Sequence, residues 1–254
     1  MIRSLTLLFS LVAVIQGGEA RVGGHATKRE GAHASPALRA AAHGPAGTLA
    51  NLAPQADPKV IALAVDAMQC AQRNGTGGDA TRLAVIDYSR SSLTPRLWVF
   101  DLAKRELLYQ EVVAHGQGSG EDVPTRFSNR DGSHQSSLGL FYTRDTYQGR
   151  NGYSMRMQGL ETGINDAAMA RAIVMHGADY VDPGTGRQRG RLGRSWGCPA
   201  LRKAVARPII DLMKNGQFVF SYYPDQAWLA RSALLNCSRG HTANLAADTA
   251  LRSH

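Results

Sequence analysis

Apolar residues fall on one face of a helix in the segment that follows Asp57. They are Val60, Ile61, Ala64, Val65, Met68 and Ala71. Asp57 suits the N-cap, and Pro58 suits the first helical position, where a backbone N–H has no intrahelical partner. The pattern therefore predicts a helix that begins at Pro58 and ends before Gly75.

A second helical pattern follows Cys198. Pro199 suits a first helical position, and residues 200–215 place apolar side chains on one face before Gly216 ends the segment. These apolar residues are Leu201, Val205, Ile209, Leu212 and Met213. The pattern predicts that Cys198 lies at a helix N-terminus, where unpaired N–H groups favour a thiolate and lower the pKa of the thiol.

Between these two segments, runs of apolar and β-branched residues predict a series of strands. They lie at 82–88, 95–101, 107–114, 136–143, 153–157 and 172–175. Turn-forming residues at 101–104 join the second and third strands as a hairpin, and residues 165–171 form a helical turn. The expected fold class is therefore mainly β with a few helices (α+β).

Two segments between the strands are predicted to be loops. Gly, Ser, Asn and Asp are abundant in residues 116–136, and a loop of that length in a compact domain is usually functional or mobile. We expect it to form one wall of a cleft. His115, which precedes it, is expected to be a loop residue without a chemical role. Residues 179–194 form the second loop, with a turn at 182–184.

The ends of the chain differ in composition from its centre. Residues 1–20 combine a basic Arg3, a short apolar stretch and small residues before a cleavage position, which is typical of a secretory signal peptide. No transmembrane span is expected after cleavage, and an uncleaved anchor is the alternative. Residues 21–56 are predicted to be a disordered linker, 57–226 the folded domain and 227–254 a C-terminal tail.

Composition and charge narrow the choice of partners. The chain has 254 residues, 43% of them hydrophobic, which is enough for one domain with a substantial core. Its formal net charge is +9 at pH 7. The basic residues are spread widely, without a zinc-finger spacing or an RNA-binding signature, so no nucleic-acid partner is expected. For an exported basic protein, an anionic polymer of the cell envelope is the expected partner.

The chain has three cysteines, Cys70, Cys198 and Cys237. An odd number in an oxidising compartment calls for an explanation. If Cys198 stays a thiol, Cys70 and Cys237 are candidates for a disulfide between the first helix and the tail. Two unpaired thiols in apolar surroundings are the alternative.

Cys198 and His176 are the candidate catalytic pair. The predicted strand at 172–175 places His176 at its end, where a neutral imidazole within reach of the thiol takes up its proton. The amides of Gly197 and Cys198 are candidates for an oxyanion hole, and the whole arrangement suits acyl transfer. The alternative is that Cys198 is a small buried hydrophobe and His176 a loop residue.

His176 and Gly177, followed by Ser195, Gly197 and Cys198, resemble the signature of the L,D-transpeptidase (YkuD-type) catalytic domain. Residues 190–200 closely resemble its murein L,D-transpeptidase subgroup, and the resemblance covers roughly residues 57–224. It implies a YkuD-like β-sandwich or barrel that acts on peptidoglycan stem peptides without a cofactor or a metal. One departure is that Trp196 stands where the family commonly has a second histidine.

The resemblance also implies a mechanism. Cys198 attacks a carbonyl of a tetrapeptide stem to give a thioester, His176 acts as the base, and the acyl group passes to a second stem as a 3→3 cross-link. By motif position, the carbonyl of Gly177 orients the imidazole.

Four arginines, Arg187, Arg189, Arg191 and Arg194, lie between the two halves of this pair. Their guanidinium groups match the geometry of the carboxylates that stem peptides carry, and Arg194 is the residue expected to bind substrate, beside Ser195 and Trp196. The alternative is a solvated loop.

Two other functions use the same sequence features. One is a peptidoglycan L,D-carboxypeptidase or endopeptidase, a hydrolase on the same Cys/His site, which differs only in the access of water to the thioester. The other is a non-catalytic module that binds the cell wall. All three place the protein in the periplasm or outside the cell, and the sequence sets no oligomeric state.

Overall fold

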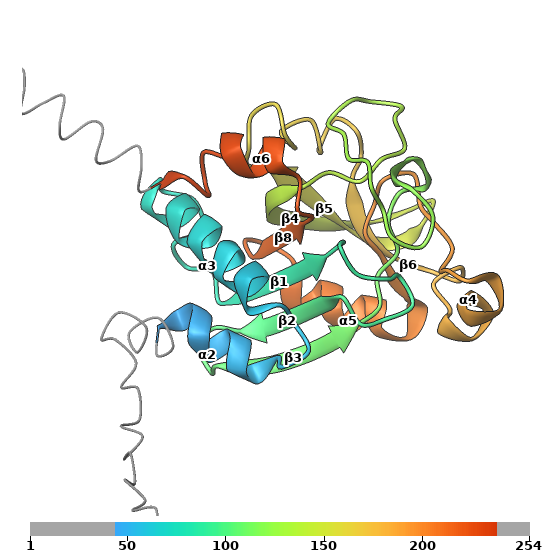
Figure 1. Ribbon diagram of the computed structural model, residues 1–254, viewed down its shortest axis with the longest axis horizontal. Helices are drawn as coiled ribbons and strands as arrows, with labels where there is room; N and C mark the ends of the chain where they lie inside the picture. Colours follow the sequence, from blue (N-terminus) through green and yellow to red (C-terminus); the bar gives the residue numbers. More distant parts are fainter. Residues whose placement is uncertain (1–43, 238–254) are drawn as a thin grey trace, which may run out of the picture. The chain divides into compact units, whose positions relative to one another are not determined.

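The computed structural model describes residues 44–237, and a single eight-stranded sheet forms their centre (Figure 1). Its strand order is β3-β2-β1-β8-β4-β5-β6-β7. The strands are β1 (Arg82–Asp87), β2 (Leu97–Asp101), β3 (Glu106–Glu111), β4 (Gly139–Gly149), β5 (Gly152–Gly159), β6 (Val174–Ala178), β7 (Ala200–Arg202) and β8 (Phe218–Tyr222). The β1/β8 and β6/β7 pairs are parallel and the others antiparallel. The expected mainly β fold and the β2/β3 hairpin are confirmed.

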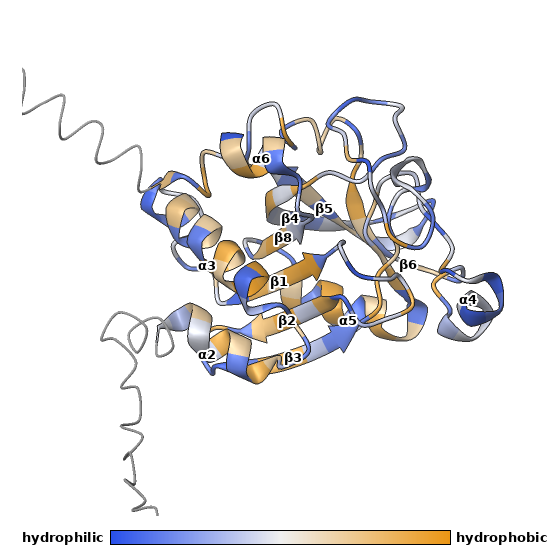
Figure 2. Ribbon diagram, viewed as in Figure 1, coloured by the Kyte–Doolittle hydropathy of each residue, from blue (hydrophilic) through white to orange (hydrophobic). Residues whose placement is uncertain are grey.

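Helices cover both faces of this sheet. They are α2 (Pro45–Leu52), α3 (Pro58–Arg73), α4 (Pro183–Arg189), α5 (Lys203–Met213) and α6 (Gln226–Arg231). Successive side chains of a strand point to opposite faces. In β1, Leu83 and Val85 therefore join the core under α2 and α3, and Ala84 and Ile86 join the core under α5. Because both faces are covered, β1 and β2 are apolar apart from charged residues at their ends (Figure 2).

The helix α3 begins and ends where the sequence predicts. The Asp57 carboxylate accepts a hydrogen bond from the Lys59 amide at 2.8 Å, and Pro58 occupies the first helical position. The last helical residue is Arg73, two positions before Gly75. The residues predicted to face the core are all buried, so periodicity and capping were sufficient to define this element.

The folded domain extends further in both directions than the sequence predicts. Within the supposed linker, Leu49 of α2 is only 3% exposed and packs into the core with Ala53. Beyond residue 226, Trp228 of α6 is also buried in that core. The linker prediction is therefore wrong for residues 45–56, and the tail prediction is wrong for 227–237. The predicted signal peptide and the first part of the linker lie outside the described residues.

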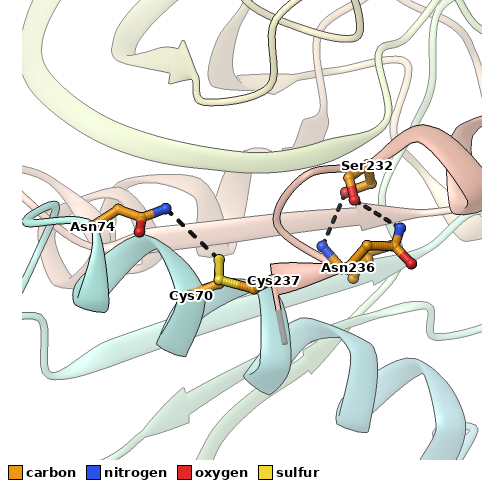
Figure 3. Close-up of a disulfide and its surroundings, with 6 residues drawn as sticks. Cys70, Asn74, Ser232, Asn236 and Cys237 are labelled. Carbon is orange, nitrogen blue, oxygen red and sulfur yellow. Dashed lines mark hydrogen bonds between the residues drawn. A yellow bond between two sulfur atoms is a disulfide. The ribbon is translucent and has the colours of Figure 1, made fainter. Parts of the chain in front are cut away.

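Cys70 and Cys237 form a disulfide, the pairing that the sequence left open (Figure 3). It joins α3 to the segment after α6, with a separation of 167 residues along the chain. Asn236, next to Cys237, donates a hydrogen bond to the Ser232 carbonyl at 2.8 Å, which fixes the segment that carries the cysteine. Cys198 is the free cysteine of the described residues.

The helix predicted to begin directly after Cys198 begins later. Residues 200–202 form β7, which pairs with β6 in a register that places Ala200 opposite His176, and α5 starts only at Lys203. Pairing with a neighbouring strand outweighs the helical pattern at these positions. A second difference concerns the predicted turn at 182–184, where Asp182 instead caps the helix α4 through the Thr185 amide.

No helix within residues 44–237 is both long and apolar enough to span a bilayer.

Candidate active site

The β6/β7 pair brings His176 and Cys198 to one place. His176 lies in the middle of β6, not beyond its end, and faces Ala200 across the ladder. Cys198 lies two residues before Ala200, the first residue of β7. The loop that carries Cys198 therefore ends beside β6. The sulfur accepts a hydrogen bond from the Val174 amide at 3.4 Å, which places it against the start of β6.

Both residues line a cleft of about 420 Å³. Its lining consists of Arg150, Asn151, His176, Tyr180, Arg194, Ser195, Trp196 and Cys198. The structure thus brings together the predicted catalytic pair and all three predicted substrate-binding residues. The loop at 116–136 was expected to form a wall of this cleft, but it contributes no lining residue. The β4/β5 turn, with Arg150 and Asn151, and Tyr180 complete the lining instead.

Backbone hydrogen bonds from segment 114–117 hold both ends of the cysteine loop, the segment between Ser195 and Ala200 that carries Cys198. The Ala114 amide donates to the Ala200 carbonyl at 2.9 Å on one side of Cys198. On the other side, the Ser195 amide donates to the His115 carbonyl at 3.0 Å, and the Gln117 amide donates to the Ser195 carbonyl at 2.8 Å. The loop that carries Cys198 is therefore held by backbone hydrogen bonds that its own sequence does not reveal.

The environment of Cys198 favours the neutral thiol. The residue is 8% exposed, and burial raises the pKa of the Cys198 thiol, opposed to a smaller extent by the Val174 amide and the Arg171 guanidinium. The expectation of a lowered pKa is wrong because no helix begins at Cys198. Deprotonation of this thiol requires a base.

His176 is in the right form to be that base. Its Nδ1 lies 3.0 Å from the Gly177 carbonyl, which only accepts hydrogen bonds, so Nδ1 carries the proton and Nε2 has a free lone pair. Burial lowers the pKa of His176 below its ordinary value of 6.5, and the Gly177 carbonyl opposes this effect. Among the described residues no hydrogen bond joins the imidazole to the thiol.

The two amides expected to form an oxyanion hole differ in their availability. The Gly197 amide already donates to the Ser195 hydroxyl at 3.1 Å, and that hydroxyl donates to the Cys198 carbonyl at 2.6 Å. The Cys198 amide has no hydrogen-bond acceptor in the described part of the chain. Of these two amides, the Cys198 N–H is therefore the one available to an oxyanion, and the Ser195 hydroxyl holds the loop in place.

Arg194 is the one member of the predicted arginine cluster that lines this cleft. Its Nη1 donates to the Gly120 carbonyl at 2.6 Å and to the Glu121 carboxylate at 2.8 Å. The other oxygen of Glu121 pairs with Nε of Arg191 at 2.7 Å. Anchoring through a single nitrogen holds the Arg194 guanidinium in place and leaves Nε and Nη2 without an acceptor among the described residues.

Trp196 forms an exposed aromatic surface at the cleft. It is 65% exposed, and its ring stacks on that of His134 with a centroid distance of 4.9 Å and an interplanar angle of 8°. The loop at 116–136 thus contacts a lining residue of the cleft through the ring of His134. Sequence reasoning assigned no function to Arg150, Asn151 or Tyr180, because nothing local shows that they approach Cys198.

No group of three His, Cys, Asp or Glu side chains that would hold a metal ion occurs within residues 44–237.

Comparison with models of known protein families identifies an L,D-transpeptidase catalytic domain. The family model with that description matches residues 52–222, which is more than half of the chain. The chain therefore belongs to the L,D-transpeptidase catalytic domain family. No curated protein matches it.

The solved structures that are similar to this chain are distant in sequence. An L,D-transpeptidase from Mycobacterium smegmatis is 16% identical, with 57% of this chain and 59% of that one covered and a TM-score of 0.35. L,D-transpeptidase 1 from Mycobacterium tuberculosis is 14% identical, with 56% and 62% covered and a TM-score of 0.32. The helical cell shape determining protein Pgp2 from Campylobacter jejuni is 10% identical, with 70% and 62% covered and a TM-score of 0.42. The chain spans less than two thirds of the length of each.

Proposed function

We propose that this protein is a cysteine-dependent L,D-transpeptidase that forms 3→3 cross-links between peptidoglycan tetrapeptide stems, in the periplasm or outside the cell. The observation that carries the proposal is the cleft of about 420 Å³ that contains Cys198, a neutral His176 and Arg194. The free amide of Cys198 lies on the same loop. Family membership supports the reaction type, and the predicted signal peptide supports the location.

In the first step, Nε2 of His176 takes the thiol proton while Sγ of Cys198 attacks the carbonyl of the third stem residue, a diaminopimelate. The carbonyl oxygen becomes an oxyanion, which accepts a hydrogen bond from the Cys198 amide. Collapse of this intermediate breaks the bond to the terminal D-Ala, whose amine takes the proton from His176. The products are a thioester on Cys198 and free D-Ala.

In the second step, the side-chain amine of a second stem attacks the thioester carbonyl, and neutral His176 removes the proton of that amine. The C–S bond breaks, a new amide joins the two stems, and the proton returns to Cys198. Cross-linking requires that the amine attacks the thioester before water hydrolyses it. The hydrolase differs at this step alone.

Arg194 is proposed to bind a carboxylate of the donor stem. Its guanidinium is anchored on one nitrogen by Gly120 and Glu121 and presents the rest of its donors to the cleft that contains Cys198. Charge-assisted hydrogen bonds of this kind contribute roughly 1.5–3 kcal/mol. Trp196 is proposed to contact the apolar parts of the same stem.

The decisive test is intact-mass spectrometry of the purified protein with disaccharide-tetrapeptide, beside Cys198→Ala, with chromatography of the products. A tripeptide adduct on the wild-type protein and 3→3 dimers are expected, and both are expected to disappear in Cys198→Ala. Free tripeptide without dimers would instead identify the hydrolase. Binding without any product that depends on Cys198 would identify the non-catalytic wall-binding module.

Arg194→Met tests the substrate-binding proposal, and Arg191→Met is its matched control because Arg191 shares Glu121 but does not line the catalytic cleft. We expect Arg194→Met to raise KM for the tetrapeptide about tenfold or more, from the loss of a charge-assisted contact. Arg191→Met should leave KM within about twofold. Equal effects of the two substitutions would show that the Glu121 ion pairs matter only for structure.

A further inference from the structure

We propose that Ser136 is a positioning residue that aims the Cys198 amide at the oxyanion. Ser136 lies on the segment before β4, sixty-two residues away from Cys198 in the sequence, and does not line the cleft. The inference rests on the proposed function, because it assigns a role to a residue in the acyl-transfer step.

The hydroxyl of Ser136 is buried and fully engaged. The residue is 1% exposed, and its Oγ–H donates to the Gly197 carbonyl at 3.1 Å. The same oxygen accepts a hydrogen bond from the Gly116 amide at 3.0 Å. The backbone N–H of Ser136 donates to the Ser119 hydroxyl at 2.9 Å, so the serine itself has little freedom to move. It connects the cysteine loop to segment 114–117.

The orientation of one peptide group follows from this contact. The bond between Gly197 and Cys198 is trans, as are all peptide bonds of the described residues, so its C=O and N–H point in opposite directions. Ser136 holds the carbonyl toward the protein interior. The Cys198 N–H must then point away from Ser136, and it has no acceptor among the described residues.

Gly197 makes this restraint necessary. Its φ of +122° lies in a region that glycine enters freely, so the peptide plane that follows it is not fixed by local sterics. A Cβ at Gly197 would lie 2.9 Å from the Gln135 carbonyl oxygen, so a larger residue cannot take over the task. The Ser136 hydroxyl is the side-chain donor that fixes this peptide from the carbonyl side.

A misplaced Cys198 amide should slow only those reactions that pass through an oxyanion. Acylation of Cys198 by p-nitrophenyl acetate forms a C–S bond and a tetrahedral oxyanion, and p-nitrophenolate then leaves. Alkylation by iodoacetamide forms a C–S bond and releases iodide without any oxyanion. Both need the same thiol and the same base. The ratio of the two rate constants therefore reports the oxyanion site separately from the nucleophile.

The test measures both rate constants for the wild-type protein, Ser136→Ala and Ser92→Ala. Ser92 is the matched control because it is equally buried, and its hydroxyl also donates one hydrogen bond and accepts one, to Asp122 and from the Leu192 amide. For Ser136→Ala we expect the acylation-to-alkylation ratio to fall about ten- to a hundredfold, since a misplacement of about 1 Å costs about a hundredfold. For Ser92→Ala we expect an unchanged ratio.

Each outcome decides one point. An unchanged ratio in Ser136→Ala would overturn the inference and leave the transpeptidase proposal intact. Failure of the wild-type protein to acylate with either p-nitrophenyl acetate or tetrapeptide, although iodoacetamide labels Cys198, would overturn the proposed function itself. If Ser136→Ala does not fold, the ratio is measured for Ser136→Thr and Ser136→Val instead. Their side chains have the same shape, but only threonine has a hydroxyl group. A ratio near the wild-type value in the threonine variant and a reduced ratio in the valine variant support the inference, and equal ratios overturn it.

Discussion

His115 should make the stability of this protein depend on pH in a measurable way. The side chain is buried against the Arg96 guanidinium, whose Nη2 lies 2.8 Å from Nδ1 of the imidazole. An arginine only donates, so Nδ1 is the acceptor and the imidazole is neutral. Burial and then the Arg96 charge lower the pKa of His115 to about 3, and the Gly120 carbonyl opposes them. The free energy of unfolding is therefore to be compared between pH 7 and pH 4.

The sign and size of the effect follow from proton linkage. In the unfolded chain His115 takes up its proton near pH 6.5, but in the folded protein only near pH 3. Its contribution to stability is therefore present above pH 6.5 and is lost as the pH falls toward 3. Between pH 7 and pH 4 this single residue should reduce the free energy of unfolding by about 3 kcal/mol.

The assay is urea denaturation of the wild-type protein and of His115→Asn at pH 7, 6, 5 and 4. Asparagine keeps an acceptor for Arg96 but takes up no proton. Carboxylates such as Glu121 and Asp122, whose pKa values are lowered, also cost stability in acid, but they do so in both proteins. We expect the wild-type protein to lose about 3 kcal/mol more than the variant. Parallel curves would refute the assignment of a neutral, buried His115.

Three further predictions concern the disulfide and the cleft. Replacing Cys70 and Cys237 by Ala should lower the free energy of unfolding by up to about 5 kcal/mol, from closure of a loop of 167 residues, as a shift in the urea midpoint would show. Because burial lowers the pKa of His176, the acidic limb of the kcat/KM profile should lie below pH 6.5, and a limb above that value would contradict the assignment of the base. Gly197→Ala should reduce acylation of Cys198 about a hundredfold or more, while the midpoint of thermal unfolding serves as its control for folding.

The sequence predicts the parts of the fold that local chemistry determines. Asp57 and Pro58 start α3, and the apolar periodicity after them is sufficient to place its buried face. The β2/β3 hairpin follows from turn residues between two strands. The two residues of the candidate catalytic pair belong to short motifs, and both line the cleft.

The sequence fails where a contact between distant segments decides the structure. Residues 200–202 have a helical pattern, but pairing with β6 makes them a strand, and the predicted effect of a helix dipole on Cys198 disappears with the helix. Leu49 is buried because α2 packs on α3, although its own segment has a composition typical of a linker. Ser136 reaches Gly197 across sixty-one positions, and no local pattern marks that contact.

A half-buried cation, Arg171, acts on the charge state of Cys198. Arg171 donates hydrogen bonds to the Gln135 carbonyl at 2.7 Å and to the hydroxyls of Ser133 and Ser137, all neutral acceptors. No ion pair within the described residues neutralises its charge. That charge lowers the pKa of Cys198 only in part, because burial of the thiol has the larger effect. In the proposed mechanism, the Arg171 charge stabilises the thiolate that forms when His176 takes the proton.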